Sequence, residues 1–290
     1  MSQAPATPAE PTWRKIRFRN IDWSTGGGIG ILHVGCLFAP FTFTWSGFAL
    51  AGFLWWLCGG LGICVCFHRL LTHRSFKTPK IVEYVLTILG TMSWQGSPIK
   101  WVGVHRLHHQ HSDGEDDPHS PKHGFNWSHV LWCVVKAPKG SRRRDAAKDL
   151  QRDPVMRIID RWHFVPLILL AFAVYFLGEF LFQAGWSWVV WGVCVRTVFT
   201  YHATWFVNSA GHTWGYKNFE TGDDSKNIWW VSLLSFGEGW HNNHHWMQRS
   251  ARHGMRWWEF DMTYLTIRLM KLMGLARDII EPNGKGAPIS

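Results

Sequence analysis

The most informative absence in this sequence is charge: no Asp, Glu, Lys or Arg occurs between Asp22 and His68. One crossing of a bilayer needs roughly 20 apolar residues, so this uncharged run is long enough for two crossings. Internal repeats and low-complexity blocks are also missing, and only 17% of the residues are charged whereas 47% are hydrophobic. This composition excludes a disordered, collagen-like or ordinary soluble chain.

A paired cysteine framework and a signal peptide are missing as well. The six cysteines lie mostly in apolar runs, so we expect buried thiols in a reducing compartment rather than disulfides. Cys64 and Cys66 are close to His68 and could be soft metal ligands, but small core residues are the simpler interpretation. The N-terminal segment MSQAPATPAEPTW has no apolar core and no cleavage site. We therefore predict a short cytoplasmic tail over residues 1–25.

Long apolar runs, with 21 Trp and 19 Phe in the chain, dominate what is present. They predict four transmembrane helices in two tight hairpins, at about residues 26–44, 48–67, 164–182 and 186–207. Basic residues precede the first run and fill the long segment between the hairpins, while neither tight turn contains Lys or Arg. The positive-inside rule then places both termini and the long segment in the cytoplasm.

The expected fold class is an all-α membrane protein with a cytoplasmic helical cap. Its expected parts are a first hairpin at 26–67, a cytoplasmic segment at 68–163, a second hairpin at 164–207 and a cytoplasmic C-terminal segment at 208–290. The run at 81–99 is long enough for a marginal fifth crossing. Such a crossing would separate His68 from His105, so we predict a helix in the interface or packed on the bundle, and likewise for 262–275.

Three histidine clusters give the strongest functional signal: His68-Arg-Leu-Leu-Thr-His73, His105-Arg-Leu-His108-His109 and His241-Asn-Asn-His244-His245. Neutral imidazole is a good ligand for iron, copper, nickel and zinc. Residues i and i+4 of a helix share a face, so His105 and His109 can reach one metal, and so can His241 and His245. The i+3 residues His108 and His244 point aside and suit a second metal nearby. Two metal ions are therefore predicted.

The first cluster needs a special geometry, because His68 and His73 are five residues apart and converge only where a helix ends or is distorted. His212, just after the fourth apolar run, is a ninth candidate ligand, and Asn208 could hold a metal-bound water beside it. Carboxylates that orient ligating imidazoles are a further possibility, against solvated charges as the alternative. The candidates for that role are Asp116, Asp117 and Glu238.

The remaining eight histidines are open to simpler interpretations. Those near the second cluster are either hydrogen-bond partners of the ligands or solvated loop residues: His111, His119, His123 and His129. The others are expected to pack in the core or at interfaces: His33, His163, His202 and His253.

The segments HRLLTHRSFKTP, WVGVHRLHHQHSDGEDDPHSP, WFVNSAGH and FGEGWHNNHH followed by SARHG resemble the membrane fatty-acid desaturase family, in particular its delta-9 acyl-lipid and acyl-CoA branch. The resemblance covers roughly residues 29–275 and implies two irons at the cytoplasmic mouth of a four-span bundle. By position, one iron would take His68, His73, His105, His109 and His244. The other would take His108, His212, His241 and His245, with Asn208 acting through water. Gln110 departs from the Lys of many relatives.

The resemblance also implies a reaction, in which O2 is used to insert a cis double bond into a long acyl chain. Unactivated methylene groups have no acidic proton and no leaving group, so acid–base or nucleophilic groups alone cannot remove their hydrogens. A fused heme domain with an HPGG motif is missing, so an external electron donor, a ferredoxin or cytochrome b5, is expected. The basic cytoplasmic face suits an acidic donor or anionic lipid headgroups. No nucleic-acid partner is expected.

The chain beyond a mid-chain double bond is about as long as two helical turns. We therefore predict that Trp56, with Gly60 making room, closes an apolar tunnel for the acyl chain; a Trp facing lipid is the alternative. A hydroxylase or ketolase on the same scaffold is the nearest rival function, and a non-catalytic metal-binding membrane protein or transporter is the second. The clusters leave the acyl carrier, the double-bond position and the donor open.

Overall fold

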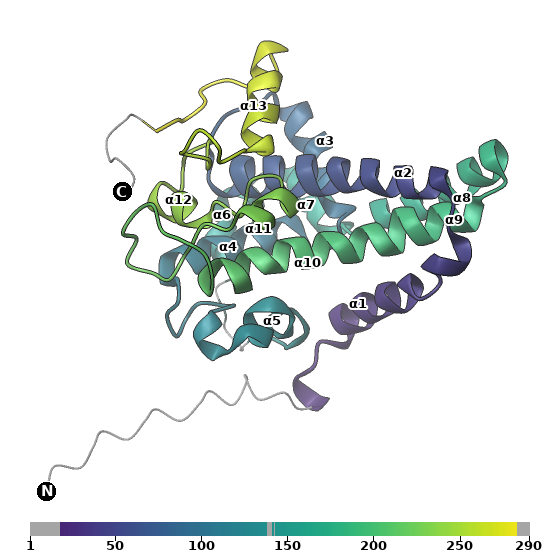
Figure 1. The fold of residues 1–290 in the computed structure, drawn as a ribbon, viewed down its shortest axis with the longest axis horizontal. Coiled ribbons are helices and arrows are strands. Elements are labelled where there is room, and N and C mark those ends of the chain that lie inside the picture. Colours follow the sequence, from purple (N-terminus) through teal and green to yellow (C-terminus); the bar gives the residue numbers. More distant parts are fainter. Residues whose placement is uncertain (1–17, 138–140, 142, 283–290) are drawn as a thin grey trace, which may run out of the picture.

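The computed structural model describes residues 18–137, 141 and 143–282. Over these residues the chain is helical, with isolated β-bridges only, which confirms the expected all-α class. Figure 1 shows the longer helices running roughly along the long axis and the shorter ones gathered at one end. The helices of the long bundle are α1 (Trp23–Cys36), α2 (Trp45–Leu54), which continues into a second segment, α8 (Val165–Phe182) and α10 (Arg196–Ser209).

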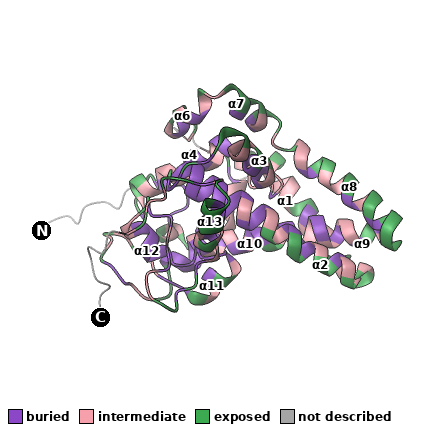
Figure 2. Cartoon of the chain, turned by 90° about the horizontal axis from the view of Figure 1, so that it is seen from above, coloured by how far each residue is buried: buried purple, intermediate pink, exposed green. Residues whose placement is uncertain are grey.

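Two of the described helices are long and apolar enough to cross a membrane. The first is the 28-residue helix Trp45–Thr72, in which α2 continues into the π-helical segment η3 (Trp55–Thr72). The second is α8, whose 18 residues contain a single charged side chain, Glu179. Only 17% of α8 is buried, and Figure 2 shows its mostly exposed surface. These helices correspond to the second and third apolar runs.

The first and fourth apolar runs are also helical, and only the first helix differs clearly from its predicted bounds. Helix α1 ends at Cys36, well before the predicted end, because the chain then enters a 3-10 turn, Ala39–Thr42, with Pro40 near its start. The fourth run forms one continuous helix from α9 (Gly185–Val189) through η7 (Val190–Val195) to α10. Arg196 lies inside this helix and is 1% exposed.

The two tight turns lie together at one end of the bundle. The hydroxyl groups of Thr44 and Ser187 are 2.7 Å apart and share a hydrogen bond. The indole nitrogen of Trp191 donates to the carbonyl of Ala39 at 3.2 Å. Gly47 packs against Ser187 so closely that a side chain at this glycine would overlap the serine hydroxyl. The hairpins are therefore fixed to each other through side chains of both turns.

The ambiguous run at 81–99 forms α3 (Lys80–Thr91), a turn and the start of α4 (Pro98–His111). Helix α3 packs on η3 at two glycines, since a Cβ on Gly62 would lie 2.4 Å from the backbone nitrogen of Gly90. The turn is held by α10, where Arg196 donates to the carbonyl of Met92 at 2.8 Å. The chain then reverses, and α4 returns to the histidine-bearing end of η3.

Short helices complete that end of the molecule. They are η5 (Trp127–Leu131), α5 (Trp132–Val134), α6 (Lys148–Gln151), α7 (Pro154–Arg161), α11 (Trp229–Leu234), α12 (His241–Trp246) and α13 (Met262–Leu272). A salt bridge of 2.6 Å joins Arg106 of α4 to Asp149 of α6. Helix α13 packs on η3, where it buries Ile267 in the core, and it leaves Leu265, Leu269 and Leu272 exposed.

Candidate metal centre

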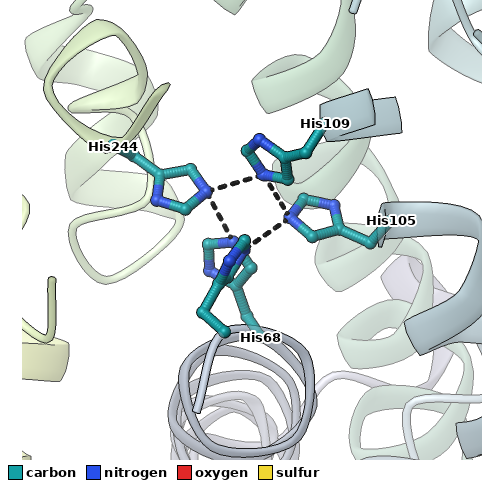
Figure 3. A group of neighbouring side chains, drawn as sticks. His68, His105, His109 and His244 are labelled. Carbon is teal, nitrogen blue, oxygen red and sulfur yellow. Dashed lines mark hydrogen bonds between the residues drawn. The ribbon is translucent and has the colours of Figure 1, made fainter. Parts of the chain in front are cut away.

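Five imidazoles from three parts of the chain converge on one point. They are His68 and His73 at the end of η3, His105 and His109 on α4, and His244 on α12. The Nε2 atom of His244 lies 3.1 Å from that of His68 and 2.9 Å from that of His109. Figure 3 shows the rings of His68, His105, His109 and His244 pointing toward one another. We call this set the five-histidine group.

The π-helical geometry of η3 explains how His68 and His73 meet. In a π-helix the hydrogen bonds run from residue i to i+5, and the backbone N–H of His73 donates to the carbonyl of His68 at 3.1 Å. Residues five apart therefore lie on the same face of the helix, and the centroids of the two rings are 4.8 Å apart. The distortion expected from the spacing is therefore present, as a π-helix rather than a frayed end.

Four further imidazoles form a second set beside the first. They are His108, His212, His241 and His245, and we call them the four-histidine group. The Nε2 atoms of His212 and His241 are 2.9 Å apart, and those of His108 and His245 are 3.4 Å apart. All four side chains are buried. His105 and His109, four residues apart, belong to the five-histidine group, and His241 and His245 belong to the four-histidine group. His108 and His244, each three residues after the first histidine of its cluster, belong to the opposite group. This is the division inferred from the helical spacing.

The two asparagines between the histidines of α12 explain how so short a helix is held. Asn242 accepts from the backbone N–H groups of Asn218 and Phe219 and donates to the carbonyl of Phe219. Asn243 donates to the carboxylate of Glu259 and to the carbonyl of His253, each at 2.8 Å. Because both amides are fully buried, they fix α12 to the two loops around it.

Carboxylates contact the far ring nitrogen, Nδ1, of several of these histidines. Two of them were candidates from the sequence: Glu238 lies 2.7 Å from His68, and Asp117 lies 3.0 Å from His108. Two more were missed by the sequence reasoning. Asp113 lies 3.1 Å from His212, and Asp223 lies 2.7 Å from His245. Such contacts fix the ring orientation and direct the Nε2 lone pair inward.

The signals for the missed residues differ. Asp113 is in the acidic stretch after the second cluster, whereas the sequence separates Asp223 widely from His245. The third candidate carboxylate, Asp116, is exposed. His119 is buried, and its Nδ1 lies 3.8 Å from Asp117. His253, expected only to pack, contacts Glu238 at 3.1 Å and stacks on His244 with 4.4 Å between ring centroids.

Electrostatics keep most of these imidazoles neutral at pH 7. Burial lowers the pKa of five histidines well below the usual value, and neighbouring imidazoles add to the effect: His73, His105, His109, His241 and His244. Burial also lowers the pKa of His245 to about 4, although Asp223 opposes the shift. Burial acts to raise the pKa of Asp117, but His108 and His119 lower it below its usual range. Neutral imidazole is the form that binds a metal.

The donor set fits iron. Ligands at right angles around one ion, each about 2.1 Å from it, have donor atoms about 3 Å apart, and the Nε2 atoms of His109 and His105 are 3.0 Å apart. The centre consists of imidazole nitrogen, which suits iron, zinc and copper better than magnesium or calcium. Cys64 and Cys66 are buried outside both groups, where Cys64 donates to the carbonyl of Ser235 and Cys66 contacts Thr87.

Several predicted residues lie outside the two groups. His111 is exposed, and His163 contacts the carbonyl of Asp160 at 2.8 Å. Three other histidines form a hydrogen-bonded row across α1, α10 and η5, with His202 at its middle, 3.0 Å from His129 and 3.4 Å from His33. This row packs three elements of the bundle together.

Two cavities meet beside the five-histidine group. One cavity, which we call the inner cavity, extends along η3 from His68 to Trp55, and the second is lined by residues of α1, α4 and α10. Both are lined by four residues at their junction: Trp101, His105, Thr204 and Asn208. Asn208, predicted to hold a metal-bound water, therefore faces the same space as His105 and His241.

The residues chosen for the tunnel end lie one position away from the cavity wall. Trp55 and Gly59 line the inner cavity, and Trp55 packs on Phe236 with 4.5 Å between ring centroids. Trp56 is 38% exposed, and Gly60 is buried beneath it. The choice of Trp56 and Gly60 counted helical turns back from His68 with α-helical spacing. Because η3 is a π-helix with more residues per turn, other residues share the face of His68.

With the site described, comparison with known proteins defines its class. The fatty acid desaturase family model matches residues 31–270. A protein from Anabaena variabilis named sn-1 stearoyl-lipid 9-desaturase is 49% identical over 86% of this chain and 90% of its own length. An sn-2 palmitoyl-lipid 9-desaturase from Nostoc sp. is 43% identical over 89% and 90%, and an sn-1 stearoyl-lipid 9-desaturase from Synechocystis sp. is 47% identical over 84% and 75%.

The chain therefore belongs to the fatty acid desaturase family and is an enzyme of that kind. Desaturases of this family are in general iron-dependent, and the two histidine groups are suited to bind metal.

Proposed function

We propose that this enzyme uses O2 and two irons to insert a cis double bond, at the delta-9 position, into a long saturated acyl chain of a glycerolipid. The observation that carries the proposal is the meeting of two cavities at His105, at the edge of the five-histidine group. An extended chain has space on both sides of that point. The relatives named as lipid 9-desaturases support both the position of the double bond and the lipid substrate.

The proposed ligands are the members of the two histidine groups. One iron would be held by the five-histidine group and the other by the four-histidine group, with Asn208 acting through water. Bound iron would supply the oxidising chemistry that takes hydrogen from unactivated methylene groups, which no side chain at this site can do. Glu238, Asp117, Asp113 and Asp223 hold the imidazoles in orientation for the metal.

The protein's own contribution is to position the chain and exclude water. The surface of the inner cavity is mainly apolar, and Trp55, Ile63 and Phe236 contribute to it. Such a wall favours an alkyl chain over water and fixes which carbons lie beside His105. Desolvation of the site also limits side reactions of the reactive intermediates.

A bilayer is the proposed environment. Helix α8 exposes large apolar side chains, including Phe172, Phe176 and Phe180, which a hydrocarbon phase would cover. We propose four crossings, in the hairpins 26–67 and 164–207, with both termini and the centre in the cytoplasm. The tail 1–25 and the segments 68–163 and 208–290 would then be cytoplasmic.

An external donor is proposed to supply electrons from the cytoplasmic side. The chain carries a formal charge of +10. A small acidic carrier, a ferredoxin or a cytochrome b5, is complementary to that charge.

Expression in a host without desaturases tests this proposal, with gas chromatography and mass spectrometry of glycerolipids and of the acyl-CoA pool. A 9-ene that appears first in glycerolipids is the expected result. An alcohol at the same position would instead indicate a hydroxylase, and a metal-loaded protein without any oxidised lipid would indicate a non-catalytic metal binder. The His108→Ala variant, which removes a buried ligand, serves as the inactive control.

A further inference from the structure

The two histidine groups differ in the acidic residues that contact them. Three of the four members of the four-histidine group have a carboxylate on Nδ1: His108 with Asp117, His212 with Asp113 and His245 with Asp223. In the five-histidine group, among the residues that the structure describes, only His68 has such a contact, with Glu238. The group with fewer imidazoles therefore has more carboxylates.

The charges of these carboxylates are compensated to different extents. Glu238 also accepts from the guanidinium of Arg69 at 3.1 Å, and Arg69, which is fully buried, bonds Asp261 at 3.0 Å as well. These three residues together carry one net negative charge. The positively charged side chain of Arg69 is thus part of the network next to the five-histidine group.

The three aspartates beside the four-histidine group are held by neutral donors. Asp117 accepts from two backbone N–H groups, Asp113 accepts from the N–H of Asp224, and Asp223 accepts from the hydroxyls of Ser225 and Thr221. Lys217 donates to the backbone carbonyl of Asp223 rather than to its carboxylate. Within the described part of the chain, none of the three forms an ion pair with Lys or Arg.

The larger number of carboxylates and their weaker charge compensation both favour metal binding at the four-histidine group. A carboxylate that accepts the far N–H of an imidazole makes the metal-binding nitrogen a stronger donor. Uncompensated negative charge near a buried ion adds an attraction that water screens only weakly, and Asp117 and Asp113 are 0% and 3% exposed. The effect of three such carboxylates exceeds that of one carboxylate paired with Arg69.

We propose that the four-histidine group holds its metal ion more tightly than the five-histidine group, although it offers one imidazole fewer. This inference rests on the proposed di-iron function. Its consequence is an enzyme that loses iron in two steps, with the five-histidine group emptied first. Loss of one carboxylate partner weakens metal binding roughly 10- to 100-fold, so Asp223 and Asp113 control the slow step and Glu238 the fast one.

The experiment measures iron per protein during incubation of the purified, iron-loaded enzyme with a water-soluble chelator. The wild type should lose one iron quickly and the second at least ten times more slowly. Asp223→Asn and Asp113→Asn should each accelerate the slow phase, whereas Glu238→Gln should accelerate the fast phase alone. Loss of both irons in one phase, or a slow phase that responds to Glu238→Gln and not to the aspartate variants, would overturn the proposal.

Matched variants separate charge from folding. Asp223→Glu keeps the negative charge and should retain a slow phase, and Glu220→Gln, at an exposed position in the same loop, should leave both phases unchanged. Mössbauer spectra of enzyme loaded with ⁵⁷Fe distinguish the two irons during incubation with the chelator. The signal of the iron that the wild type keeps longest should be lost early in Asp113→Asn. This measurement supports the conclusion without relying on the loss rates of one variant. Two bound irons without alkene formation would refute the proposed function and leave this inference standing, and a protein that binds no iron would refute both.

Discussion

The side-chain amide of Gln95 donates a hydrogen bond of 2.9 Å to the hydroxyl of Thr204, at the place where the two cavities meet. The carbonyl of the same amide accepts from the indole N–H of Trp101 at 3.1 Å. Gln95 therefore links α10 to α4 beside His105. This bridge fixes the part of the wall that the two cavities share.

The first prediction concerns this bridge. Thr204→Val removes the hydroxyl acceptor without changing the side-chain volume, so the shared wall is no longer fixed and more than one carbon pair can reach the centre. We expect lower activity and products with double bonds at neighbouring positions, identified by mass spectrometry of derivatised esters. Thr197→Val is the control, because Thr197 is buried on the same helix and its hydroxyl bonds no described residue. A single unchanged double-bond position in Thr204→Val would refute this role.

The second prediction concerns acyl length. Trp55 lies on the wall of the inner cavity, whereas Trp56 is partly exposed. Trp55→Ala should lengthen the cavity and shift products toward longer chains, which the chain-length profile of total lipids measures. Trp56→Ala should leave the profile unchanged. The opposite pattern, with an effect of Trp56→Ala alone, would restore the assignment made from sequence.

The third prediction concerns the buried amide of Asn243. Its replacement by Ala removes hydrogen bonds to Glu259 and to the carbonyl of His253, and Glu259 is only 4% exposed. The variant leaves the buried carbonyl of His253 without this donor and the buried amide of Asn227 without this acceptor, while Glu259 keeps other donors. We expect a cost of about 2–4 kcal/mol of stability. The midpoint of thermal unfolding of the metal-free protein in detergent measures the loss. Asn126→Ala, at an exposed position, should have no effect, and equal midpoints for both variants would contradict the assignment.

The fourth prediction concerns pH. Burial acts to raise the pKa of Asp149, but hydrogen bonds and ion pairs with Arg106 and Arg74 lower it to about 2. A carboxyl whose pKa is lower in the folded state stabilises the fold above its unfolded pKa, and this stabilisation disappears as pH falls through the folded pKa. Asp149→Asn should cost about 1–2 kcal/mol at pH 7, given partial exposure.

The gap in stability between wild type and Asp149→Asn should close between about pH 4 and pH 2. Unfolding curves across this range, with the exposed Asp145→Asn as a control, provide the measurement. A gap that persists at pH 2 would show that packing rather than charge accounts for the effect.

Much of the metal centre follows from the sequence because helical spacing is a local property. The i and i+4 relation divides the second and third clusters correctly, and the five-residue gap between His68 and His73 signals the helix distortion that η3 contains. Asp223 could not be found in this way, since its contact with His245 depends on how a loop folds back. His253 was assigned to packing for the same reason.

The helices themselves were less predictable at their ends. Apolar composition marks all four long runs but not the early stop of α1 at Cys36, which depends on packing between the two hairpin turns. Trp56 and Gly60 lie one residue from the wall of the inner cavity because their choice assumed an α-helical register, whereas η3 is a π-helix. The reversal at Met92 likewise depends on Arg196, which is distant in sequence.

The central claim is that two irons held by the two histidine groups enable desaturation of a lipid acyl chain. The most direct test measures iron content and product together, in purified enzyme supplied with O2, a reduced donor and a saturated glycerolipid. The account predicts two irons per chain and O2-dependent formation of a 9-ene, with iron content reduced and product abolished in His108→Ala. Full activity of His108→Ala, or a hydroxylated product from the wild type, would contradict it.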